Sequence, residues 1–125
     1  MIEEGLEGIS RAHGLPSLTM NDFYRAIVPY TTYVEPTQEE LRSMKLRGTK
    51  HFRVPITSLV GMQFYVCRFG VAKYKRLIKS GKQKTPPVVS LRQGKYMLEN
   101  GFHRVQAYHE LGYKTVKVGI SAWYA

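Results

Sequence analysis

The residues with the clearest potential for chemistry are the six consecutive positions Glu99–Arg104, which read ENGFHR. A strand-like run at 95–98 precedes them and a helix-like run at 105–111 follows. A glycine turn that opens a helix presents unpaired backbone N–H groups and the positive end of the helix dipole, which favours an anion such as phosphate. Histidine and arginine in the first helical turn add a titratable imidazole and a bidentate fork. The segment therefore predicts a phosphate-handling site.

Each polar member of this segment has an expected role and a structural alternative. Gly101 would let a phosphate approach the backbone, or it would only form a strand–helix turn. His103 and Arg104 would stabilise charge on phosphoryl oxygens, whereas the alternatives are a surface histidine and an Arg104–Glu99 ion pair. Glu99 would be the general base or a magnesium ligand, although strand alternation would aim it at the other face. Asn100 is expected to cap the helix.

The composition is that of one globular domain. The chain has 125 residues, of which 43% are hydrophobic, and no segment approaches the roughly 20 apolar residues of a membrane span. The acidic start of the chain lacks the apolar region of a secretory signal. The single cysteine, Cys67, forms no internal disulfide and offers no zinc-ligand pair. These features favour a reducing, cytoplasmic setting without membrane insertion.

The positive charge is concentrated after residue 40. The net charge is +10, but positions 41–125 hold seventeen Lys and Arg against only Glu99 and Glu110. Such a field favours polyanions, with nucleic acid as the first candidate partner and an anionic membrane as the second. A solubilising surface is the alternative. The densest group follows the helical pattern at 71–78, and we predict nucleic-acid contacts from Lys73, Lys75, Arg76, Lys79, Lys82 and Lys84.

The N-terminal 50 residues are loosely patterned. We divide the chain into an N-terminal extension, mostly helix and loop, at 1–50 and a domain at 51–125. Thr19 or Asn21 would cap a short helix through Ile27. The sequence 37–40 reads as a capping box that starts a second helix, which should run to about residue 47 and end at Gly48.

The remainder predicts an α/β (α+β) domain with helices around a small mixed sheet. Its strands are expected at 51–57, 88–91, 96–98 and 115–120, the middle two forming a hairpin around Gln93–Gly94. Helices are expected at 71–78 and from Gly101 to Leu111. The stretch that follows Gly61 is expected to be irregular. The last helix places a core stripe at Phe102, Val105, Tyr108 and Leu111.

The region from about 52 to 120 resembles the ParB/sulfiredoxin superfamily, including its ParB-like nuclease-domain members. The resemblance is carried by a strand ending VPITSL, a basic helix, the PPVVSL hairpin strand, and NGFHR followed by Ala107 and by Leu111–Gly112. It implies a fold that uses the glycine turn to hold phosphates. Relatives include CTP-hydrolysing partition proteins, an ATP-dependent sulfinic-acid reductase, ADP-dependent serine kinases and plasmid proteins described as nucleases.

The resemblance also implies a set of phosphate contacts. Gly101 would be the close-approach glycine, and Arg68 resembles the arginine that follows the first strand in partition proteins. Lys79 falls where the family's basic helix ends near the nucleotide. The implied phosphate- or nucleotide-binding residues are Arg68, Lys79, Asn100, Gly101, Phe102, His103 and Arg104.

Three departures bear on catalysis. Sulfiredoxins have their catalytic cysteine where this chain has Phe102, and Cys67 lies far away in sequence. Partition proteins have Glu at that position and Arg at the position of His103, with DNA-binding and dimerisation domains further on. Many ParB-like members have Asp where this chain has Asn100.

The sequence thus predicts a domain that binds a nucleotide or a nucleic-acid phosphate, DNA-associated in a plasmid, phage or other mobile element. As an enzyme it would be a nuclease or an NTPase acting on ATP or CTP with Mg²⁺, using Glu99, His103 and Arg104. The first alternative is a non-catalytic DNA- or protein-binding module that has lost the family's catalytic groups, and the second is a small-molecule kinase. A homodimer or a protein partner stays open.

Overall fold

A computed structural model describes residues 18–47 and 51–121. Its elements are, in chain order, η1 (Met20–Asp22), β1 (Phe23–Arg25), α2 (Gln38–Arg47), β2 (His51–Pro55), η2 (Ile56–Ser58), β3 (Leu59–Gly61), β4 (Tyr65–Cys67), α3 (Arg68–Lys79), β5 (Val88–Arg92), β6 (Lys95–Asn100), α4 (Phe102–Glu110) and β7 (Thr115–Ile120). None of the helices in these ranges is long and apolar enough to cross a membrane.

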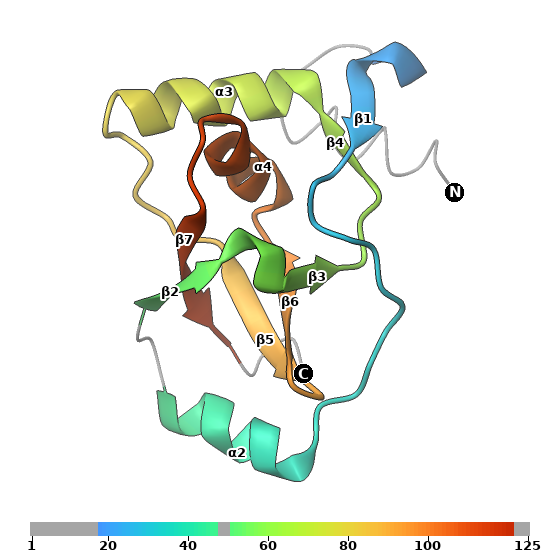
Figure 1. Ribbon diagram of the computed structural model, residues 1–125, viewed down its shortest axis with the longest axis vertical. Helices are drawn as coiled ribbons and strands as arrows, with labels where there is room; N and C mark the ends of the chain where they lie inside the picture. The colour runs from blue at the N-terminus through green and yellow to red at the C-terminus, as the bar shows by residue number, and fades with distance from the viewer. Residues whose placement is uncertain (1–17, 48–50, 122–125) are drawn as a thin grey trace.

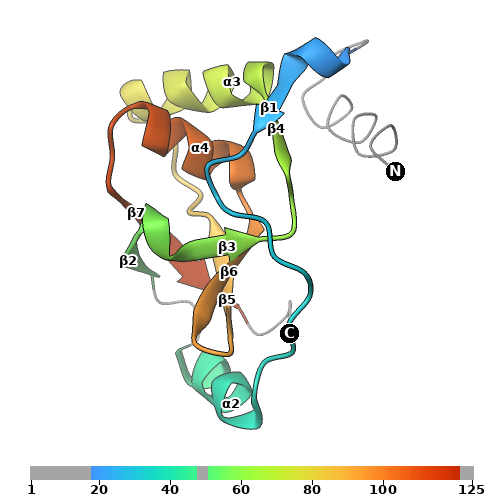
Figure 2. The same ribbon diagram turned by 45° about the vertical axis from the view of Figure 1, so that its right-hand side comes forward.

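A five-stranded mixed sheet organises the molecule. Its order is β2-β7-β5-β6-β3, with β2·β7 and β5·β6 antiparallel and β5·β7 and β3·β6 parallel. Figure 1 shows α4 between the sheet and α3, and α2 at the opposite end beside the β5–β6 hairpin. The view in Figure 2 keeps the same arrangement. The predicted α+β class with a small mixed sheet is confirmed.

Residues of the sheet and of α4 pack together in the hydrophobic core. Val89, Leu98 and Val118 of the sheet are buried together with Val105 and Ala107 of α4. On α4 the predicted stripe faces this core, because its first two members are fully buried and the last two are half-buried. The helix therefore presents its opposite face to α3 and to solvent.

The segment before α2 packs onto the core as a β-strand paired with another strand, and not as a helix. A helix over 19–27 was expected, but the chain forms only the short turn η1 and then β1, which pairs antiparallel with β4. The strand satisfies its backbone groups on a partner more than 40 residues away, which local periodicity does not reveal. Ala26 and Val28 are buried as a result, whereas Ile27 is 40% exposed. The domain boundary near residue 50 stays a prediction.

The predicted capping box at the start of α2 is present, and its glutamate also binds the β5–β6 turn. Thr37 N–H donates to Glu40 Oε1 at 2.9 Å, and Glu40 N–H donates to Thr37 Oγ1 at 3.1 Å. The same carboxylate accepts from the N–H groups of Gln93 and Gly94 in the hairpin turn, at 2.7 and 2.9 Å. Burial would raise the pKa of Glu40, but these hydrogen bonds outweigh it and lower the pKa. One side chain thus fixes both the helix start and the β5–β6 turn. The expected end at Gly48 lies outside the described residues.

Two short strands were not predicted: β3 lies directly before the stretch expected to be irregular, and β4 lies within it. β3 pairs with β6 through Leu59–Tyr96, and β4 pairs with β1 through Cys67–Phe23. Each strand has three residues, too few for an alternating pattern to be distinctive. Because β4 runs directly into α3, that helix begins at Arg68, three residues before the predicted start.

Candidate functional site: the start of α4 and the outer face of α3

Gly101 is the N-cap of α4 and could not be replaced without strain. Its φ is +100°, in the left-handed region. A Cβ added there would lie 2.9 Å from Pro87 Cβ and 3.2 Å from Arg104 Nε. Asn100, expected to be the cap, is instead the last residue of β6, and no side chain caps the helix. The first-turn N–H groups of α4 have no acceptor within the helix.

Phe102 points into the core and not toward a substrate. It is 9% exposed. A Cβ added to Gly61 on β3 would lie 2.3 Å from Phe102 Cζ, so the phenyl ring occupies the space that this glycine leaves open. At the position where the family resemblance places a catalytic cysteine, this chain has a packing residue.

The guanidinium of Arg104 is engaged by the protein itself. Arg104 is 8% exposed. Its Nη1 donates to the carbonyls of Thr85 at 2.8 Å and Pro86 at 3.3 Å, and its Nη2 donates to Asn100 Oδ1 at 3.1 Å. Its Nε is buried with no hydrogen-bond partner within the described ranges. Arg104 thus ties the loop before β5 to the end of β6, and the alternative ion pair with Glu99 does not form.

His103 connects α4 to the start of α3. Its Nε2 accepts the backbone N–H of Cys67 at 3.0 Å. An imidazole nitrogen that accepts carries no proton, so the network assigns the neutral tautomer protonated on Nδ1. Protonation of Nε2 would remove this bond.

Arg68 lies next to this junction and has an acidic partner. Its Nε donates to Asp22 Oδ1 at 2.9 Å, and its guanidinium lies 4.2 Å from the centroid of the Phe69 ring. The backbone N–H of Thr19 and the guanidinium of Arg68 lower the pKa of Asp22. The structure brings Arg68 and His103 to the same junction through Cys67.

Glu99 points away from the glycine turn. Its Oε1 accepts from Ser90 Oγ at 2.5 Å and from Arg92 Nη2 at 3.0 Å. The side chains of Arg92 and Glu99 are 2% and 9% exposed, so this is a buried ion pair. Arg92 also donates to the carbonyl of Val34 at 2.9 Å. The carboxylate proposed as base or metal ligand is thus part of the interior.

The described residues place no metal-ligand cluster around Glu99. Across residues 18–47 and 51–121, no three His, Cys, Asp or Glu side chains are grouped so that they could hold a metal ion. A magnesium ion would fit Glu99 poorly, because one carboxylate oxygen is already held by Ser90 and Arg92 and a cation would displace the guanidinium.

Lys75 belongs to a network between α3 and α4. Its Nζ lies 2.6 Å from Glu110 Oε1, and Glu110 Oε2 accepts from Tyr24 and from Gln106. Burial would raise the pKa of Glu110, but the hydrogen bonds from Lys75, Tyr24 and Gln106 together lower it. Burial and the bond to Glu110 raise the pKa of Tyr24. This predicted nucleic-acid contact therefore has a structural partner.

The other predicted nucleic-acid contacts lie on an exposed surface that we call the basic face. Its members are Lys73, Arg76 and Lys79 of α3 with Lys82 and Lys84 of the following loop. All five are exposed, and none forms an ion pair with a described residue. The spacing of three residues on α3 places its members along one side of the helix. Figure 1 shows α3 leading away from β1 and β4, with the loop that follows it at the far end.

The residues predicted to contact phosphate do not all lie close to one another. Arg68 and Lys79 lie at opposite ends of α3, separated by about 16 Å along the helix axis. Sequence reasoning also missed Arg92 as the partner of Glu99. A signal was available, since Ser90, Arg92, Met97 and Glu99 alternate onto one face of the hairpin.

A search of solved structures finds the same fold in a sulfiredoxin. The crystal structure of sulfiredoxin from Arabidopsis thaliana matches with a TM-score of 0.50 and 20% sequence identity, covering 57% of this chain and 83% of that chain. A scan of protein-family models and a search of curated protein sequences gave no match. The expected sulfiredoxin-like fold is confirmed over this part of the chain, while the identity is too low to carry over an activity.

Proposed function

We propose that this sulfiredoxin-like chain is a non-catalytic module that binds the phosphate backbone of nucleic acid through its basic face. The observation that carries the proposal is a contrast in the engagement of charged side chains. Glu99, His103 and Arg104 each hold an internal partner. The five cations of the basic face are exposed and have no acidic partner among the described residues.

The geometry of the basic face suits a polyanion. Along α3 the step between its cations is three residues, a rise of about 4.5 Å. Long side chains spaced in this way can contact successive phosphates from one rigid helix. Lys82 and Lys84 extend the row beyond Lys79, the last residue of the helix. The contacts are to the backbone, so the proposal includes affinity for DNA with little sequence preference.

The helix behind this face is held firmly. Val71 of α3 is buried, and the ion pair between Lys75 and Glu110 joins α3 to α4. The cation that faces inward is therefore used for positioning, and those that face outward are left for a ligand. The proposal keeps the cytoplasmic, plasmid- or phage-associated setting expected from the sequence.

A second candidate function, nucleotide binding at the start of α4, is favoured by a different observation. Gly101 leaves the N–H groups of the first turn without helical acceptors, and the fold is shared with a sulfiredoxin. In this case Arg104 would position the turn instead of contacting phosphate, because its guanidinium already binds two carbonyls. A nuclease, NTPase or kinase reaction would further need a base that the described site does not place there.

Two charge-matched variants test the proposal. The first replaces Lys73, Arg76, Lys79, Lys82 and Lys84 with Gln. The second replaces five exposed cations elsewhere, Arg42, Lys45, Arg53, Lys95 and Lys117, with Gln. Fluorescence anisotropy with a labelled DNA duplex measures the affinity of each variant at several salt concentrations.

Because the two variants have the same net charge, comparing them distinguishes binding at the basic face from non-specific attraction of DNA by the overall positive charge. We expect the first to lower affinity by on the order of 100-fold and to reduce the salt slope by about 4.5, because each of the five lost phosphate contacts reduces it by about 0.9. The second should change affinity by less than about threefold. Equal losses in both variants would contradict the proposal.

A further inference from the structure

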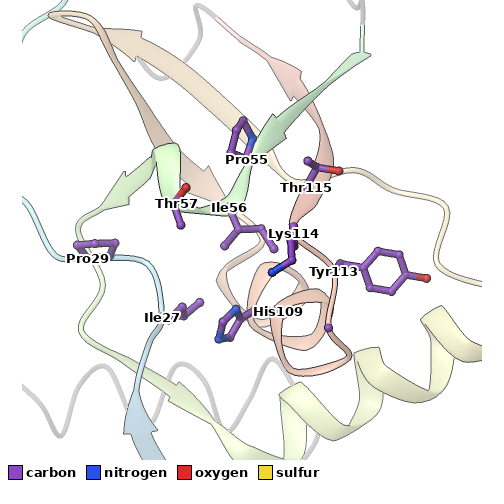
Figure 3. A pocket seen from close by; sticks show the side chains of 10 residues that line it. Ile27, Pro29, Pro55, Ile56, Thr57, His109, Tyr113, Lys114 and Thr115 are labelled. Carbon is purple, nitrogen blue, oxygen red and sulfur yellow. The ribbon is translucent and has the colours of Figure 1, made fainter.

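A cavity of about 540 Å³ lies at the end of α4 opposite to the glycine turn. Three stretches of the chain line it, and Figure 3 shows their side chains. The lining residues are Ile27, Pro29, Pro55, Ile56, Thr57, His109, Gly112, Tyr113, Lys114 and Thr115. The volume is within the range of roughly 300–1,000 Å³ that is typical of small-molecule sites.

The lining combines an apolar wall with positive charge. Ile27, Pro29 and Ile56 form the wall on one side. Figure 3 shows the side chains of Lys114 and His109 directed toward the space in front of that wall. None of the described residues that line the cavity is acidic.

The nearest acidic neighbour in sequence is engaged elsewhere. Glu110 follows His109 directly, but its carboxylate binds Lys75, Tyr24 and Gln106. The charge of Lys114 is therefore not neutralised by this carboxylate, and no ion pair of Lys114 with a described residue is present.

Hydrogen bonds fix the segments that line the cavity in the absence of a ligand. Ile27 N–H donates to Gln106 Oε1 at 2.7 Å, and Ile56 N–H donates to the carbonyl of Lys114 at 3.0 Å. The end of α4 is closed by Gly112 N–H on the carbonyl of His109, also at 3.0 Å. These bonds hold the apolar wall and the lysine backbone at a set separation, which reduces the entropy lost on binding.

We propose that this cavity binds a small organic carboxylate with an apolar body. The hydrocarbon part would cover Ile27, which is 40% exposed without a ligand. The carboxylate would accept a hydrogen bond from Lys114 Nζ, with His109 as a second donor. The site lies apart from the basic face and is independent of nucleic-acid binding.

Three ligands of equal chain length test this inference on the intact protein. Octanoate, octanol and octylammonium share one hydrocarbon body and differ in charge. Isothermal titration calorimetry measures each with the wild type, with Lys114→Glu and with the control Lys117→Glu. The control makes the same charge reversal at an exposed lysine of β7 that does not line the cavity.

We expect saturable binding of octanoate, about fivefold tighter than octanol and with octylammonium weakest, as for one partly exposed charge pair. Lys114→Glu should reverse the order of the two charged ligands, and Lys117→Glu should preserve it. Ile27→Trp, which fills the space from an exposed position, should weaken all three. The inference is overturned by octanoate binding no tighter than octanol, by no saturable binding, or by Lys114→Glu leaving the octanoate affinity unchanged.

Discussion

The start of α4 and the basic face of α3 carry similar residue types but use them in opposite ways. At the start of α4, the Arg104 guanidinium is buried against two backbone carbonyls and an amide oxygen. On the basic face, Arg76 is exposed and has no ion-pair partner among the described residues. The comparison shows that a charged residue within a recognisable sequence motif can stabilise the fold. The cations of the lysine-rich helix α3, in contrast, stay exposed to a partner.

The same contrast applies to the acidic residues. Glu99 was assigned to chemistry because it precedes the glycine turn, yet it completes a buried pair with Arg92. Glu110, at the end of α4, joins Tyr24, Lys75 and Gln106. Both carboxylates stabilise contacts between elements. The helix α3 itself contains no acidic residue, so it offers no intrahelical partner to the cations of the basic face.

The largest effect is expected when the buried ion pair is broken. Glu99→Ala should lower the free energy of unfolding by about 3–5 kcal/mol, because it leaves the Arg92 guanidinium buried without its counter-charge. Urea denaturation followed by circular dichroism measures the change. Replacing both partners with apolar residues, Arg92→Met with Glu99→Leu, should recover a large part of the loss. A Glu99→Ala variant as stable as the wild type would show that the carboxylate is free for other chemistry.

Removal of Arg104 is expected to have the next largest effect. Arg104→Ala removes the side-chain donor to the carbonyl of Pro86 and one of two side-chain donors to the carbonyl of Thr85, and it should cost about 2–3 kcal/mol in unfolding free energy. Arg76→Ala, from the exposed basic face, is the matched control and should cost less than about 0.5 kcal/mol. The affinity for DNA should show the reverse pattern, with the larger loss for Arg76→Ala. If Arg104→Ala abolished DNA binding without loss of stability, the contrast between the two regions would fail.

The smallest effect concerns pH. The folded-state pKa of Glu110 is lowered from the usual 4.5, so its contribution to stability is present above that pH and is lost as pH falls through the folded value. Glu110→Gln should remove a contribution of about 0.5 kcal/mol at neutral pH and flatten the stability profile below pH 4.5. Thermal unfolding from pH 3 to 7 tests this. Parallel profiles for the two proteins would contradict the assigned network.

Regular elements with local signals were predictable from the sequence. The capping box at Thr37 and Glu40, the turn at Gln93–Gly94 and the strand at 115–120 all depend on neighbouring residues, and the structure contains each of them. β1, β3 and β4 were not predicted. Their three-residue pairings join distant segments, such as Phe23 with Cys67, and only tertiary structure selects them.

The glycine turn at the start of α4 was predictable from the sequence, but the hydrogen-bond partners of its side chains were not. A glycine turn at Gly101 and the helix that follows were expected from residue types alone, and the structure adds that the φ of Gly101 is positive. The acceptors of Arg104 are main-chain carbonyls of Thr85 and Pro86, which every residue possesses and which therefore give no sequence signal. For the same reason, the bond from the Cys67 N–H to His103 could only come from the fold.

The most direct test of the central claim is a titration of ¹⁵N-labelled protein with a short DNA duplex, followed by two-dimensional NMR. The account predicts that the largest chemical-shift changes fall on Lys73, Arg76 and Lys79 of α3 and on the loop at 80–84, and that 150 mM added salt reduces them. Largest changes at Gly101–Arg104, with the basic face unmoved, would contradict it.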